Sequence, residues 1–122
     1  MVAVTSGGAF LLRARPEAIE RALQDLSPRQ RQIDVVLLHK LLIERVLGVS
    51  EEAVRALRNI AYLRDPAEAI QRVRDGAELA FLMNPVTVPQ LRDVAFAGEV
   101  MPQKSTDFYP KLLSGMAIYA LD

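Results

Sequence analysis

The sequence predicts an α/β fold: a β-hairpin, then helices, then a β-α-β-α-β succession that forms a mixed sheet with packed helices. Short β-prone runs bounded by turn-forming residues recur along the chain, and stretches with helical apolar spacing separate them. Hydrophobic residues make up 51% of the 122 residues, which is enough to build a core. The length fits one domain, so residues 1–122 are interpreted as a single α/β domain.

Two short strands are expected at the N-terminus. Residues 2–5 and 9–13 are β-prone, and Gly7 and Gly8 between them suit a tight hairpin turn. A strand that starts directly after Met1 suggests that the chain is part of a longer protein.

The expected helices are marked by residues that satisfy free backbone groups at their ends. Ser, Thr and Asp cap helix starts, Pro is tolerated in the first turn, and Gly suits the end. The predicted helices are residues 17–26 after Pro16, residues 30–47 ending at Gly48, a short helix capped by Ser50, a helix from Asp65 and Pro66 to Gly76, and a helix from Thr87 and Gln90 to Gly98. The broad apolar face of residues 30–47 predicts a central helix that is covered on more than one side.

Further strands are expected at residues 59–64, 78–83 and 115–121. Their alternation with helices predicts a βαβ unit with a right-handed crossover, and hence a partly parallel sheet.

Charge and composition exclude several classes of function. Lys+Arg and Asp+Glu number 15 each, and this neutrality argues against a nucleic-acid binder, because phosphates must be neutralised by basic residues. A local basic face remains an alternative, formed by Arg29, Arg31, Arg55, Arg58 and Arg64. The absence of cysteine excludes disulfides and thiolate metal sites, and the single histidine argues against a His-rich metal site. We therefore expect no metal and no cofactor.

No apolar run reaches the roughly 18 residues that suggest a membrane span, and the N-terminus does not resemble a signal peptide. The expected location is the cytoplasm, with no membrane partner.

The segment GEVMPQKSTDFYPK, residues 98–111, is the main functional candidate. Long loops rich in polar donors are more often functional than short connections. Ammonium and hydroxyl groups can bind phosphate or carboxylate, although such groups in loops also form local turn bonds or stay solvated. The candidate anion-site residues are Lys104, Ser105, Thr106, Lys111, Glu99 and Asn84. Asn84 is included because it directly follows a predicted buried strand.

Residues 98–105 also come close to the phosphate-binding loop pattern G-x-x-x-x-G-K-[ST]. Gln103 replaces the second glycine, which lets the backbone approach phosphate, and Pro102 removes an N–H from the cradle. The segment also follows a predicted helix, whereas a phosphate-binding loop follows a strand. These three departures exclude a phosphate-binding loop of that type.

The segment resembles the signature of a bacterial and archaeal family catalogued as domain of unknown function 1015, G-E-x-M-P-x-K-S-T-x-F-x-P-K. The similar stretches are MPQKSTDFYPKLLSG (101–115), IDVVLLHKLLIERVLGV (33–49), IAYLRDPAEAI (60–70) and AFLMNPVTVPQLRDVAFAGE (80–99). Asp107 stands where the family often has tyrosine. The resemblance implies that this chain is the C-terminal portion of a longer protein, and the ParB-like labels of some members suggest phosphate chemistry.

Two other polar residues are interpreted as structural. His39 could be a general base, but it lies within a predicted apolar helix without an obvious partner, because Asp34 is five residues earlier and points elsewhere around the helix. Asp65 follows a predicted strand, where catalytic residues occur, but its position also suits a helix cap.

The residues therefore leave two functions open. The first is an enzyme segment whose Lys104, Ser105 and Thr106 contribute to a phosphate or carboxylate site, of the kind found in nucleotide-binding or small-molecule kinase-like proteins. The alternative is a non-catalytic structural or protein-interaction module that docks through Phe108, Tyr109 and Pro110. In both cases the expected partner is a missing N-terminal domain or a second copy of the chain.

Overall fold

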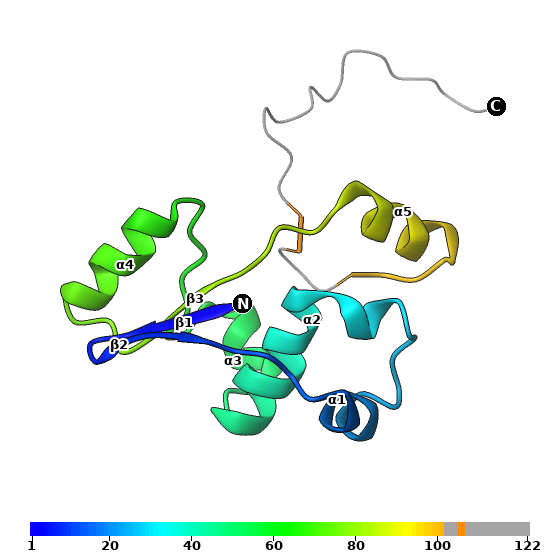
Figure 1. Cartoon of the computed structure of the whole chain (residues 1–122), viewed down its shortest axis with the longest axis horizontal. Coiled ribbons are helices and arrows are strands. Elements are labelled where there is room, and N and C mark those ends of the chain that lie inside the picture. The colour runs from blue at the N-terminus through cyan, green and yellow to red at the C-terminus, as the bar shows by residue number, and fades with distance from the viewer. Residues whose placement is uncertain (102–104, 107–122) are drawn as a thin grey trace, which may run out of the picture.

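The fold is taken from a computed structural model of the chain, which describes residues 1–101 and 105–106 (Figure 1). The elements in chain order are β1 (Val2–Thr5), β2 (Gly8–Leu11), α1 (Pro16–Ala22), the 3₁₀ helix η1 (Gln30–Gln32), α2 (Asp34–Leu37), the π-helix η2 (Leu38–Val46), α3 (Glu51–Arg55), α4 (Pro66–Arg74), β3 (Ala80–Leu82) and α5 (Val88–Phe96). This combination of a sheet with packed helices confirms the predicted α/β class.

The three described strands form an antiparallel sheet in the order β2-β1-β3. Ala3 pairs with Phe10 on one side and Phe81 on the other. Successive residues of a strand face opposite sides of the sheet, and both Ala3 and Val4 are buried, so β1 is covered on both faces. Helix α4 contacts β1 and β3 (Figure 1). Core residues of η2 and α3 pack against Phe81.

A second core cluster lies among the helices away from the sheet. It consists of Leu23, Ile33, Val35, Val36 and Val94. Ile33 and Val94 are its most deeply buried members, at 1% and 2% exposed. Met101 packs against this cluster, so the first residues after α5 share the core of the helical region.

The predicted strand at residues 59–64 is wrong. Leu57 and Asn59 adopt left-handed backbone conformations, with φ of 54° and 61°, which turn the chain instead of extending it. The apolar character of this segment comes from packing: Ile60 contacts the core beneath the sheet, and the ring of Tyr62 stacks on His39. The βαβ unit expected from residue 59 is therefore absent, and the predicted strand at residues 115–121 lies outside the described residues.

The single helix expected at residues 30–47 is divided into η1, α2 and η2. Its C-terminal part is wound as a π-helix, and the Leu47 N–H donates to the carbonyl five residues earlier, that of Leu42 (2.8 Å). The predicted caps are confirmed: Ser50 accepts from the Ala53 N–H and Asp65 from the Ala67 N–H. Among the residues that the structure covers, no helix has the length and hydropathy needed to cross a membrane.

Candidate functional site

The segment 98–111 begins where α5 ends. Gly98 has a φ of +69°, a left-handed conformation that suits glycine at a helix end. The Gly98 N–H donates to the Ala95 carbonyl (3.0 Å), and the Glu99 N–H donates to the Val94 carbonyl (3.1 Å). These bonds terminate the helix and lead the chain toward the turn between α1 and η1.

That turn is built around a reciprocal pair of hydrogen bonds, which we call the Ser27/Gln30 box. The Ser27 N–H donates to Gln30 Oε1 (3.2 Å), and the Gln30 N–H donates to Ser27 Oγ (3.2 Å). This is the capping-box arrangement, in which each side chain satisfies the other residue's backbone N–H. It fixes both side chains before they contact the segment after α5.

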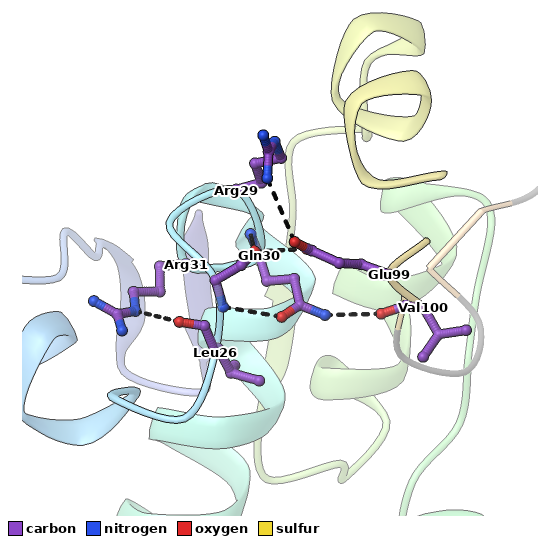
Figure 2. A network of polar contacts seen from close by, with 7 residues as sticks. Leu26, Arg29, Gln30, Arg31, Glu99 and Val100 are labelled. Carbon is purple, nitrogen blue, oxygen red and sulfur yellow. Dashed lines mark hydrogen bonds and ion pairs between the residues drawn. The ribbon is translucent and has the colours of Figure 1, made fainter. Parts of the chain in front are cut away.

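The Ser27/Gln30 box bonds directly to the start of the loop (Figure 2). The Ser27 hydroxyl donates to Glu99 Oε2 (2.6 Å), and Gln30 Nε2 donates to the Val100 carbonyl (3.0 Å). These contacts join residues about 70 positions apart in the chain. Side chain and backbone of the loop start are thus both anchored.

Two polar contacts hold the Glu99 carboxylate, and they contribute unequally to its position. Glu99 is 22% exposed and pairs with Arg29 at 3.5 Å, but the Arg29 side chain is 55% exposed, so solvent weakens this ion pair. The shorter hydroxyl–carboxylate bond from Ser27 is charge-assisted and less exposed, so it contributes more. On the other side of the turn, Arg31 donates to the carbonyls of Leu26 (2.8 Å) and Gln24 (2.9 Å).

Four of the six predicted site residues belong to the described part of the chain. Glu99 is engaged by Ser27 and Arg29, so it positions the loop. Ser105 is half-buried and Thr106 is exposed. Lys104 and Lys111 lie outside the described residues, so their part in an anion site stays a prediction.

Asn84 lies in a different place. Its Nδ2 donates to Asp34 Oδ2 (2.8 Å), and both residues line a pocket of about 180 Å³ that we call the Asp34 pocket. Glu99 is not among the residues that line this pocket.

The sequence interpretation missed Ser27 and Gln30, although a signal was present. Their Ser-x-x-Gln spacing equals the Thr-x-x-Gln spacing at Thr87 and Gln90, where the box was predicted and is confirmed. Asp34 as a partner of Asn84 had no such signal, because the two residues are 50 positions apart.

His39 lies half-buried on η2, and its ring stacks on Tyr62 with 6.3 Å between ring centroids and 15° between planes. Burial lowers the pKa of His39 below its usual value, and the neighbouring Lys40 charge lowers it further, while Glu51 opposes these effects. Lys40 is held between Glu44 (3.2 Å) and Glu51 (3.7 Å). The neutral imidazole is therefore favoured, which suits a packing role.

In residues 1–101 and 105–106, no group of three or more His, Cys, Asp or Glu residues is arranged to hold a metal ion. Asp65 serves as the N-cap of α4, as expected from its sequence position.

Comparison with known proteins returned no family model, no curated protein and no solved structure that matches this chain. The resemblance to domain of unknown function 1015 therefore stays a prediction from the sequence.

Proposed function

We propose that this protein binds a small anion, a phosphate or carboxylate group of a larger substrate, through the loop that begins at Gly98. Lys104 supplies the positive charge, and the Ser105 and Thr106 hydroxyls supply neutral donors. The rest of the site comes from an N-terminal part of a longer protein or from a second copy of the chain, and the whole acts as an enzyme on a phosphorylated or carboxylated compound.

The observation that supports this proposal is the anchoring of the loop start. The Ser27/Gln30 box holds Glu99 and Val100, and Met101 packs on the helical core. Met101 directly precedes residues 102–104, which lead to Ser105 in the sequence. Binding loops gain precision when a rigid scaffold fixes where they start, because less entropy is lost on binding.

A titration with inorganic phosphate tests the proposal. Isothermal calorimetry on the full chain is expected to show saturable binding that Lys104→Ala abolishes and Lys104→Arg retains, because either cation can pair with the anion. The exposed Arg13 gives a matched control: Arg13→Ala removes one positive charge elsewhere, so phosphate affinity should stay unchanged. Equal affinities for the parent chain and Lys104→Ala would contradict the proposal.

An observation on α5 favours the interaction module as a second candidate. Val94 is buried, while Val88 and Phe96 on other faces of the helix are exposed, Phe96 to 86%, and the adjacent Val100 is exposed as well. Large exposed apolar side chains can contribute to a docking surface. Light scattering after size exclusion tests self-association: a concentration-dependent dimer that Phe96→Ser disrupts would support this candidate, and a monomer at all concentrations would count against a second copy as partner.

A further inference from the structure

The Asp34 pocket lies between three elements of the fold. Asp34 opens α2, Asn84 follows β3, and Thr87 and Gln90 form the start of α5. Its volume of about 180 Å³ is below the roughly 300 Å³ of pockets for drug-sized ligands. The pocket therefore has room for a compound of only a few non-hydrogen atoms.

Among the described residues, Asp34 is the only charged side chain that lines the pocket, and the Met1 amino group balances part of its charge. Asp34 supplies a carboxylate, and none of the described residues in the lining is a lysine, arginine or histidine. Asp34 Oδ2 accepts from Asn84 Nδ2 at 2.8 Å, and the amino group of Met1 lies 3.8 Å from the same oxygen. Among residues 1–101 and 105–106, both contacts are to Oδ2, and a ligand would have to bond to Oδ1.

The helix start beside the pocket does not favour an anion. The N-terminus of a helix usually offers free N–H donors to anions. Here the Thr87/Gln90 box is closed on itself: the Gln90 N–H donates to Thr87 Oγ1 (3.4 Å), while Gln90 Oε1 accepts from the Thr87 N–H (2.9 Å) and hydroxyl (3.0 Å). Pro89 in the first turn has no N–H to offer.

The lining of the Asp34 pocket combines the Asp34 carboxylate with apolar side chains. Ile33, which is 1% exposed, Pro85 and Val86 belong to the lining. A carboxylate next to a short apolar wall complements an ammonium group on a small hydrocarbon body, because the head forms a charge-assisted hydrogen bond while the body is removed from water.

We propose that the Asp34 pocket binds a small primary amine in its ammonium form, with Asp34 as the charge partner and Asn84 holding the carboxylate in place. This ligand is opposite in charge to the anion of the proposed function, and the described lining of its site includes none of residues 98–101, 105 and 106. The two proposals therefore stand or fall separately.

Two-dimensional NMR on the full chain, titrated with ethylammonium chloride, tests the inference. The expected result is saturable shifts of the Asn84 side-chain amide and of the Gln90 backbone amide, with a dissociation constant in the millimolar range. Sodium acetate at the same ionic strength is expected to leave these signals in place. Shifts that do not saturate, or equal shifts with acetate, would overturn the proposal.

Two variants decide which residue carries the binding. Asp34→Asn keeps the shape of the side chain and removes its charge, so the affinity for ethylammonium should fall about tenfold or more. The control Asp25→Asn removes a charge from an exposed residue outside the pocket and should bind as the parent chain does. Asn84→Ala covers the case in which Asp34→Asn does not fold: a weaker affinity is expected, since Asp34 loses its positioning bond. Unchanged affinity in the folded Asp34 variant, or in Asn84→Ala if the former is unfolded, would overturn the inference.

Discussion

The Ser27/Gln30 box and the Thr87/Gln90 box have the same chemistry. In each, a hydroxyl residue and a glutamine three positions later satisfy one another's backbone N–H. They differ in where the hydroxyl proton goes. Thr87 donates to Gln90 within its own box, whereas Ser27 donates to Glu99 on a distant segment.

This difference shows how one local motif can serve two purposes. The Thr87/Gln90 box closes a helix start and engages the Thr87 hydroxyl and the Gln90 N–H, two donors that an anion could otherwise use. The Ser27/Gln30 box has a hydroxyl and an amide directed outward, and with them it fixes the segment after α5. The neighbour that accepts the bonds, rather than the motif, decides whether a box is a local cap or a tertiary anchor.

The largest expected effect is at Ile33, which adjoins both regions. Ile33 directly follows η1, the short helix that begins at Gln30 of the Ser27/Gln30 box. It also lines the Asp34 pocket, together with Thr87 and Gln90. Ile33→Ala should lower the free energy of unfolding by about 2–5 kcal/mol, because it opens a cavity in a closely packed core. Urea denaturation measures this loss. The exposed Leu11 provides the control, and Leu11→Ala should change stability by less than about 0.5 kcal/mol. A similar small loss for both variants would mean that the helical core does not depend on Ile33.

The next effect separates the two boxes. Ser27→Ala removes the acceptor of the Gln30 N–H and the donor to Glu99, so a loss of about 1–3 kcal/mol is expected in urea denaturation. Thr87→Ala removes only a local cap and should cost about 0.5–1 kcal/mol.

A double-mutant cycle identifies the cause of that difference. Ser27→Ala combined with Glu99→Gln should be non-additive by about 0.5 kcal/mol or more, since the two side chains are in contact. Thr87→Ala combined with Glu99→Gln should be additive. Additivity in both pairs would show that the Ser27–Glu99 bond contributes no stability.

A smaller effect is expected from pH. Neither box contains a side chain that titrates near neutrality, so this effect comes from a residue outside both boxes. His39 is such a residue, and burial lowers its pKa in the folded protein. The unfolded chain then binds the proton more readily, so stability from His39 is fully present above about pH 6.5 and is lost as pH falls through that value toward the lower folded pKa. Unfolding curves at several pH values should show this decline, and His39→Phe should remove it while keeping a ring beside Tyr62. A parallel decline in His39→Phe would assign the pH dependence to other groups.

The smallest effect is expected at Arg29. Its ion pair with Glu99 is exposed on the arginine side, so Arg29→Ala should change stability by no more than about 0.5 kcal/mol, and less at high salt. A loss as large as that of Ser27→Ala would mean that charge attraction, rather than the hydroxyl bond, holds the loop start. Denaturation at low and high salt distinguishes these cases.

Local chemistry explains which features the sequence could predict. The caps at Ser50, Asp65 and Thr87 depend on residues two or three positions apart, and all were predictable. The segment after Leu57 looked like a strand because its apolar residues resemble a strand's pattern, but they pack against helices that lie elsewhere in the chain.

Pairings over long distances in the sequence explain the rest. Helical periodicity does not distinguish a π-helix from an α-helix, so the change of winding at Leu38 was hidden. The contacts Ser27–Glu99 and Asp34–Asn84 join residues 72 and 50 positions apart, and no single-sequence pattern relates them. The place of Glu99 in an anion site stays a prediction, while its role as an anchored carboxylate depended on the fold.

In the proposed function, the Ser27/Gln30 box positions the loop for anion binding. The most direct test is the affinity for inorganic phosphate after Gln30→Ala, compared with Thr87→Ala as a control that also loses a box. Gln30 bonds the loop backbone at Val100, so its removal should weaken phosphate binding about fivefold, which corresponds to about 1 kcal/mol, while Thr87→Ala should bind as the parent chain does. Equal phosphate affinity in all three proteins, or an equal loss in both variants, would contradict the claim.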